Sequence, residues 1–290
     1  IYIYHVELYS AWPFALWTLI GLLLYFMYRH PFLFVVTVII STIGQIYSGV
    51  ALSEFDWFIL LLTIFGAGYF SQREGNALFQ TLVAVNLALQ SLVWAVTIFD
   101  HHYWYMLPVL LLYFAGDGLR RQHRQRNTVT YIALIAIFIF GMYQSFLLQD
   151  EWYMPRIPDF DGLFLSVWLV FLVFGLFYKW KTQRLEEAVD YLLFLPLVFL
   201  PAAHLLNLVV LFLFSIAWIF VGYKKDDQKQ IMYGTIAFLF STLTVYIQYA
   251  WDALDKSLFF FIGGILLFLL SFVIERQRRK LASQDKRGDA

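Results

Sequence analysis

The chain has 290 residues, of which 61% are hydrophobic and 14% are charged. Soluble domains carry about 25% charged residues, so this composition excludes an ordinary soluble fold and predicts a membrane protein. Its 20 basic and 20 acidic residues cancel, and the chain contains no cysteine. The sequence therefore indicates no polyanionic partner from net charge, and it excludes disulfides, thiolate metal sites and cysteine nucleophiles.

Apolar runs of roughly 16 to 22 residues recur along the chain, and each could cross about 30 Å of hydrocarbon as an α-helix. A membrane β-barrel would show ten-residue alternating strands instead. We therefore predict an all-α polytopic bundle of eleven transmembrane helices. The expected helices are 11–29, 32–50, 55–71, 77–98, 103–118, 129–148, 162–180, 188–203, 205–222, 231–250 and 257–274.

The connections between these runs are short, so we expect one transmembrane helical domain, 1–274, followed by a basic cytoplasmic tail, 275–290. The connections alternate in charge. One set, with the tail, holds 18 of the 20 Lys and Arg residues, and the other holds only Arg156 and Lys256. The positive-inside rule then predicts an external N-terminus and a cytoplasmic C-terminus. Because an external N-terminus usually needs a preceding helix, we also expect an upstream segment with a twelfth.

The stretch 188–223 is short for two transmembrane helices and carries Pro196, Pro201 and His204 near its middle. A single helix here would move Lys224 and Lys225 to the outer side, so we predict a hairpin. Proline removes a backbone donor and frees carbonyl groups. This broken hairpin is where we first expect the lining of a polar cavity.

Four arginines lie between the fifth and sixth expected helices. They are Arg120, Arg121, Arg124 and Arg126. We interpret this run as a topology anchor at the cytoplasmic face, where it contacts anionic lipid headgroups. Nucleic-acid binding would need a basic surface with exposed aromatic residues on a folded domain, so no nucleic-acid partner is expected.

The expected transmembrane helices contain several amides. These are Gln45, Asn86, Gln90, Gln144, Asn207 and Gln248. Asn86 and Gln90 are four residues apart and share one helix face. Two interpretations stay open, since such amides form hydrogen bonds between helices or line a polar pathway for a solute.

Three histidines gather on the expected outer side, namely His101, His102 and His204. Histidine is a competent zinc ligand, but no pair here has the i, i+4 spacing that fixes a metal, so we expect interfacial residues, no metal site and no cofactor. The flanks of Asp117 and Asp190 resemble the glycine-aspartate signature of intramembrane aspartyl proteases over four residues. Their spacing and order depart from that family, so an enzyme is not expected.

The stretch Gly44-Gln45-Ile46-Tyr47, and a Gly263-Gly264 helix that closes in a basic tail, carry a wider resemblance. In these features the chain resembles a family of bacterial polytopic inner-membrane proteins known as a domain of unknown function. Members often occur beside a small membrane protein with a GDYxxLxY motif. The resemblance implies a multi-pass protein of the bacterial inner (plasma) membrane with a small membrane-protein partner, and it implies no activity.

Two functional hypotheses follow. The span count, the amides and the proline breaks favour a transporter or permease-like protein for a small or amphipathic solute. The scarcity of charge at the expected membrane midplane, together with an aromatic-rich surface, favours a non-catalytic membrane subunit or scaffold of an envelope complex. The two are separated by whether Asn86 and Gln90 line a polar cavity or pack dry between helices.

Overall fold

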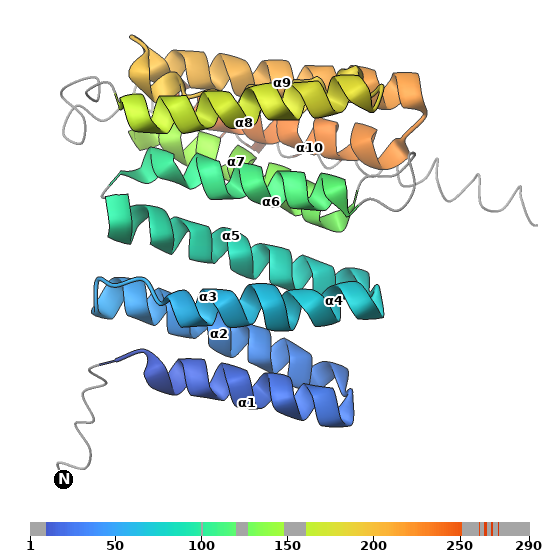
Figure 1. Cartoon of the computed structure of the whole chain (residues 1–290). Helices are drawn as coiled ribbons and strands as arrows, with labels where there is room; N and C mark the ends of the chain where they lie inside the picture. The colour runs from blue at the N-terminus through green and yellow to red at the C-terminus, as the bar shows by residue number, and fades with distance from the viewer. Residues whose placement is uncertain are drawn as a thin grey trace, which may run out of the picture. The chain divides into compact units, whose positions relative to one another are not determined.

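The computed structural model describes residues 10–99, 101–119, 127–147 and 161–250, together with Phe261, Gly264, Ile265, Phe268 and Phe272. The described residues form helices joined by turns and include no strand (Figure 1). The prediction of an all-α fold is therefore confirmed. The chain divides into two compact units, Ile1–Ala237 and Phe238–Ala290, and each is described by itself.

In chain order the first helices are α1 (Trp12–Tyr28), α2 (Pro31–Ala51), α3 (Trp57–Leu61), the π-helix η1 (Leu62–Ala67), α4 (Gly68–Glu74), α5 (Ala77–Phe99), the 3₁₀ helix η2 (His102–Tyr105), α6 (Met106–Gly118) and α7 (Thr128–Leu147). They are followed by α8 (Gly162–Lys181), the 3₁₀ helices η3 (Leu185–Phe194) and η4 (Leu197–Phe199), α9 (Ala203–Lys225), α10 (Gln228–Val245) and the π-helix η5 (Tyr246–Ala250).

Six helices among the described residues are long and apolar enough to cross a membrane. They are α2, α5, α7, α8, α9 and the stretch Gln228–Tyr249. The structure thus supports a polytopic membrane protein, whereas the expected number of eleven goes beyond these six. The difference arises because α1 has only 17 residues and α6 only 13, because η1 interrupts the third expected helix, and because 188–203 is not an α-helix. The last expected helix, 257–274, lies largely outside the described residues.

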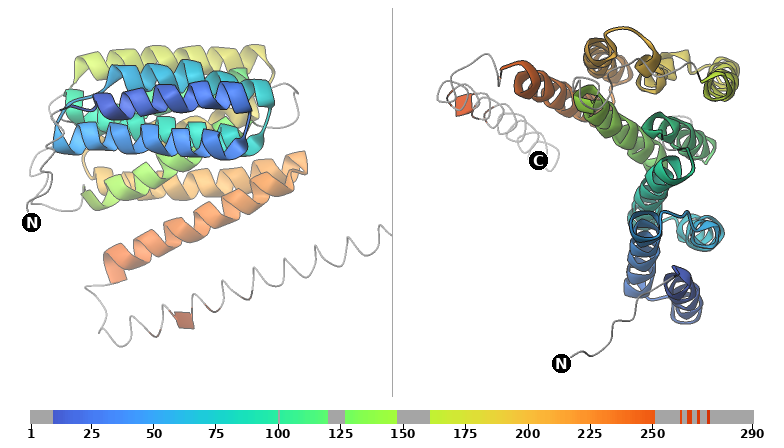
Figure 2. Two further views of the ribbon diagram at one scale, coloured as in Figure 1. Left: turned by 90° about the horizontal axis from the view of Figure 1, so that it is seen from below. Right: turned by 90° about the vertical axis from the view of Figure 1, so that its left-hand side faces the viewer.

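Within the first unit, neighbouring helices pack in sequence along the bundle. Helix α1 packs on α2, α2 on α5, α5 on α7, and α7 on both α6 and α9. Seen end on in Figure 2, α2, α5 and α7 follow one another, with α1 and α6 to the same side of them. Glycines permit the closest approach: a Cβ on Gly116 of α6 would meet the Thr130 backbone nitrogen of α7 at 2.5 Å. Small residues at such contacts are how membrane helices pack tightly without a hydrophobic driving force.

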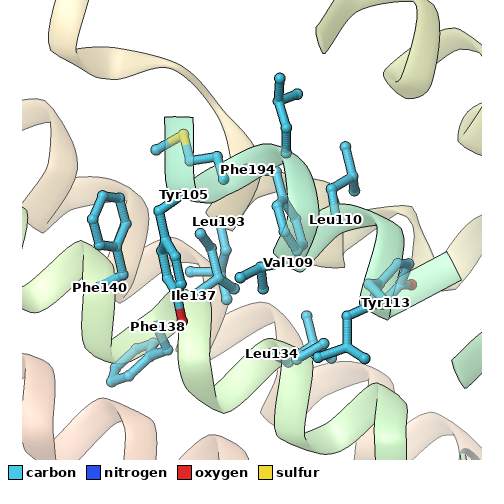
Figure 3. Close-up of a cluster of buried hydrophobic side chains, with 14 of the residues drawn as sticks. Tyr105, Val109, Leu110, Tyr113, Leu134, Ile137, Phe138, Phe140, Leu193 and Phe194 are labelled. Atoms are coloured by element: carbon cyan, nitrogen blue, oxygen red, sulfur yellow. The ribbon is translucent and has the colours of Figure 1, made fainter. Parts of the chain in front are cut away.

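The interior of the unit is aromatic and aliphatic. In Figure 3, Val109, Leu110 and Tyr113 of α6 lie between Leu134 and Ile137 of α7 and the side chains of η3. Phe194, which is fully buried, brings η3 into this cluster. The 3₁₀ segment is therefore part of the protein interior.

The segment between α8 and α9 runs antiparallel to α8. Glu187 contacts Lys179 near the end of α8, the Phe194 carbonyl accepts a hydrogen bond from Trp168 Nε1 at 2.6 Å, and Phe199 packs against Phe164 near its start. From Phe164 to Lys179, α8 rises fifteen residues, or about 22 Å. The antiparallel segment covers the same length in the twelve residues from Glu187 to Phe199. This rise per residue is close to the value of about 2.0 Å in a 3₁₀ helix. A stretched helix therefore lets a short segment run back along α8.

This return segment differs from the expected α-helix over 188–203. The backbone is interrupted at Leu195 and Pro196 and again at Leu200. Both ends are marked by left-handed residues other than glycine, Gln183 with φ 60° and Ala202 with φ 56°, a conformation that costs about 1–2 kcal/mol per residue. The prediction of a broken segment is correct, and the prediction of an α-helix is wrong, because two prolines and a short length prevent regular i to i−4 bonding.

A carboxylate fixes the start of α8 against the start of α6. Asp161 caps α8 by accepting from the Phe164 N–H at 3.0 Å, while its other oxygen accepts from Tyr103 Oη and Trp104 Nε1, both at 3.1 Å. Burial disfavours the ionised carboxylate, but these hydrogen bonds outweigh it and lower the pKa of Asp161. These hydrogen bonds of Asp161 join the starts of α6 and α8, and the opposite ends of both helices carry the charged site described below.

Candidate functional site

The ends of α6, α8 and α9 meet the start of η3 in a buried ionic network. It consists of Asp117 from α6, Lys179 from α8, Arg184 and Glu187 at the start of η3, and Lys225 from α9. The turn after α8 places these side chains together, because Gln183 in the left-handed region reverses the chain direction. Basic residues in the last turns of α8 and α9 also complement the negative ends of the helix dipoles.

The network is nearly continuous. Lys179 Nζ lies 2.9 Å from Glu187 Oε2 and 3.2 Å from Asp117 Oδ2. Arg184 Nη1 lies 2.8 Å from Asp117 Oδ1, and Lys225 Nζ lies 3.1 Å from Glu187 Oε1. The Lys179 side chain is only 1% exposed, and those of Asp117 and Glu187 are 4% and 3% exposed. Each buried carboxylate thus has two basic partners, which is what burial of charge requires.

A third carboxylate, that of Asp190, lies outside this network and deeper in the bundle. Its two oxygens accept from Tyr113 Oη at 2.6 Å and from Trp218 Nε1 at 2.8 Å, and the residue is fully buried. Trp218 lies seven residues before the end of α9, or about 10 Å from it along the axis. Asp190 therefore lies farther from the end of α9 than the ionic network does, and it belongs to the 3₁₀ helix η3.

Lys179 links the network to Asp190 through an aromatic ring. Its ammonium lies 5.1 Å from the centroid of the Tyr113 ring, within the range of a cation–π contact. The hydroxyl of the same Tyr113 donates to Asp190. Tyr191 packs beside Tyr113, and its buried hydroxyl has no hydrogen-bond partner in the described structure. The site therefore combines charge, aromatic faces and one unsatisfied polar group.

Among the predicted amides, Asn86 and Gln90 lie together. Asn86 and Gln90 of α5 are buried in one hydrogen-bonded group with Ser41 of α2 and Thr63 of η1. Gln90 Nε2 donates to Thr63 Oγ1 at 2.9 Å and to Asn86 Oδ1 at 2.7 Å, and Asn86 Nδ2 donates to Ser41 Oγ. All four amide N–H bonds of the pair are directed at protein oxygens, since Asn86 also donates to the Val38 carbonyl. Their contacts match the interhelical interpretation.

The other amides lie at separate contacts. Gln45 is buried and, with its amide oriented to satisfy both groups, bonds to the backbone N–H and C=O of Asp56 at 3.1 Å each. Asn207 of α9 donates to the Gly141 carbonyl of α7, and Gln144 is buried on α7 one turn further along. Gln248 belongs to the second unit, in η5. Gln45 and Asn207 therefore bond to different neighbours, and Gln144 Nε2 has no hydrogen-bond partner in the described structure.

The three histidines predicted to lie on the outer side have different surroundings. His101 is exposed and stacks on Tyr103, whereas His102 is half-buried against Phe140. Burial, and to a smaller extent His101, lower the pKa of His102. His204 is half-buried near the start of α9. Among the residues that the structure describes, no three His, Cys, Asp or Glu side chains are grouped to hold a metal ion.

Two other predicted features concern the arginine run and a pair of aspartates. The four arginines at 120, 121, 124 and 126 lie outside the described residues. Asp117 and Asp190, considered as an aspartyl-protease pair, have different partners: Asp117 pairs with Arg184 and Lys179, and Asp190 with Tyr113 and Trp218. A protease dyad shares one proton between two carboxylates in contact, whereas Asp117 contacts basic side chains and Asp190 accepts from neutral donors.

Sequence reasoning missed Lys179 and Glu187 as site residues. Lys179 lies two residues before Lys181, and Glu187 directly follows Glu186, so both pairs look like ordinary ends of membrane helices. The short connection after α8 could have indicated them. A segment that begins a few residues after α8 and runs back along it must place its first acidic residues near the basic end of that helix. Asp190 was identified, but not its partners, because Tyr113 and Trp218 are distant in sequence.

No family model, curated protein or solved structure matches this chain.

Proposed function

We propose that this chain is a multi-pass protein of the bacterial inner membrane that moves a small or amphipathic solute. The solute is handled at the broken segment 185–202 that contains Asp190. The observation that carries the proposal is the fully buried carboxylate of Asp190 on non-α backbone, held by Tyr113 and Trp218.

Physical cost supports this assignment. Ionisable residues within membrane bundles are expensive and mark solute or ion pathways. Irregular backbone at membrane depth is tolerated only where protein buries it or where it lines a cavity. Interrupted helices are also the usual location of substrate sites in membrane transporters. Asp190 combines all three features, about 10 Å inside the end of α9.

The proposed topology has eleven transmembrane helices, with the N-terminus outside and the C-terminus in the cytoplasm. Two groups of described charges support it. Arg29, at the end of α1, pairs with Glu74, at the end of α4, at 2.9 Å. Lys179 and Lys225, at the ends of α8 and α9, share Glu187. In the proposed topology all four helices end at the cytoplasmic face, as the positive-inside rule requires.

A non-catalytic subunit or scaffold of an envelope complex is the second candidate. It is favoured by the hydrogen bonds of Asn86 and Gln90, whose amide N–H groups all donate to oxygens of α2, α5 and η1. The small membrane-protein partner implied by the sequence resemblance belongs with this candidate. Under it, Asp190 would serve only to fix the return segment between α6 and α9.

The test is native mass spectrometry of the full chain after gentle extraction from its own membrane. We expect a retained small molecule, which is then supplied to proteoliposomes in a flux assay. Asp190→Asn should abolish flux, whereas Glu74→Gln, at a partly exposed ion pair outside this segment, should not alter it. A stoichiometric protein partner without a retained solute would favour the scaffold and overturn the transport proposal. If a solute is retained, flux that is unchanged in Asp190→Asn would refute the role assigned to Asp190.

A further inference from the structure

The Lys179 ammonium occupies a site that resembles one built for an external cation. Two carboxylates contact it at 2.9 and 3.2 Å, and the face of Tyr113 lies 5.1 Å away. Carboxylates and aromatic faces are the groups with which proteins bind ligand ammonium ions. The chain therefore contains a cation site and fills it with its own side chain.

The charges around the site would tolerate an exchange of cations. Asp117 keeps Arg184 as a partner, and Glu187 keeps Lys225, if the Lys179 ammonium leaves. Removing one member of a buried ion pair is costly mainly because the other charge is stranded. Here neither carboxylate is stranded, and a monovalent cation that replaces the ammonium restores the same total charge.

A buried hydroxyl with no partner lies beside this site. The Tyr191 hydroxyl has no hydrogen-bond partner in the described structure, although the residue is only 4% exposed. It lies against Gly175, at 2.3 Å from the position a Cβ would take. Gly175 is one helical turn before Lys179, and side chains on a helix lean toward the preceding turn. The hydroxyl therefore faces the turn over which Lys179 leans.

An unpartnered buried hydroxyl is unfavourable, and a ligand that donates an N–H group would satisfy it. We propose that Asp117, Glu187 and Tyr113, with the Tyr191 hydroxyl, form a binding site for a small primary ammonium compound, and that Lys179 is a tethered occupant which the ligand displaces. This inference rests on the proposed transport function and names the solute class, a primary amine in its cationic form.

The experiment measures how readily Lys179 reacts with a small acylating reagent. The purified full chain is treated in ethylammonium, choline or sodium chloride at equal ionic strength, and modification is quantified by peptide mass spectrometry. We expect ethylammonium to raise Lys179 acylation by about tenfold, as a rise in the displaced population would. Choline and sodium should not, since neither donates N–H hydrogen bonds. Lys181, exposed on the same helix, is the internal control and should react equally in all three salts.

Two variants sharpen the test. In Lys179→Ala the site is vacated, and ethylammonium but not choline should restore its thermal stability. Tyr191→Phe should weaken the effect of ethylammonium on Lys179 acylation. The inference is overturned if ethylammonium leaves Lys179 reactivity unchanged, or if choline and sodium act equally well.

Failure of this inference can be told apart from failure of the transport proposal. If a retained solute without an amine is moved in an Asp190-dependent way, transport stands and the ammonium site is refuted. If ethylammonium displaces Lys179 but no solute is moved in the flux assay, the ammonium site stands as a binding site and transport is refuted.

Discussion

Glu186 and Glu187 are adjacent in the chain and each contacts a lysine from α9, but they differ in burial. The Glu186 side chain is 40% exposed in its pair with Lys224, whereas the Glu187 side chain is 3% exposed and contacts both Lys179 and Lys225. We predict that Glu187→Ala destabilises the protein far more than Glu186→Ala. The comparison tests burial together with the additional contact to Lys179, because residue type, local backbone and the α9 lysine partner are shared.

The magnitude follows from the contacts. Breaking a buried ion pair from one side costs about 3–5 kcal/mol, because the remaining charge is left uncompensated. Lys179 keeps Asp117 at 3.2 Å and Lys225 is partly exposed, so we expect a value near the lower limit, about 3 kcal/mol. Exposed pairs contribute about 0–1 kcal/mol, which sets the expectation for Glu186→Ala. Glu187→Gln, which keeps one acceptor oxygen, should fall between the two.

The assay is reversible unfolding in mixed micelles, followed by circular dichroism, for the wild type and the three variants. Added salt should reduce the small effect at Glu186 and leave the effect at Glu187 nearly unchanged, because buried pairs are poorly screened. If the two alanine variants lie within about 0.5 kcal/mol of each other, a typical limit for surface substitutions, the ionic network does not contribute as the structure indicates.

Three further predictions concern helix packing and capping. Gly116→Ala should destabilise the protein by about 1–3 kcal/mol by overpacking, since its Cβ would meet backbone of α7, whereas Gly118→Ala, with nothing within 4 Å, should be neutral; equal unfolding midpoints would contradict this. The double variant Asn86→Leu, Gln90→Leu should preserve solute flux and change stability only, because the amides are packed between helices. Loss of flux in this variant would instead show that the two amides line the solute pathway. Asp161→Ala should cost about 1–2 kcal/mol at neutral pH. Because folding lowers the pKa of Asp161, the ionised carboxylate contributes its full stability above the ordinary aspartate pKa of about 3.9, and this contribution is lost as pH falls through the lowered value. The difference in unfolding free energy between wild type and Asp161→Ala should therefore narrow from pH 7 to pH 3. A constant difference would refute a role for the ionised carboxylate.

The placement of the helices was largely predictable from the sequence. Helices α2, α5, α7, α8 and α9 begin and end within a few residues of their expected bounds, because long apolar runs in lipid have few alternatives to an α-helix. The broken hairpin was also predictable, from Pro196 and Pro201 and from the charge of Lys224 and Lys225. The π-helix η1 was not, since nothing in its local sequence distinguishes a π turn from an α turn.

The candidate site was only partly predictable. Asp117, Asp190 and the amides were recognisable as polar groups in apolar surroundings, but their partners were not. Tyr113 and Trp218 look like ordinary aromatic residues of a membrane helix until both are seen to donate to Asp190. The sequence left open whether the amides bond between helices or line a pathway, because the partners of Asn86 and Asn207 lie on helices that are distant in the chain.

By itself, the sequence determined the all-α class, the apolar helices and the place where the segment before α9 is interrupted, because hydropathy and proline act locally along the chain. Only the tertiary structure decided that the return segment is a 3₁₀ helix, since that depends on the length of α8 that it must cover. It also decided that Lys179, Asp117 and Glu187 form one buried network. Such a network depends on contacts between residues far apart in the chain, and these are set by how helix ends meet rather than by any local pattern.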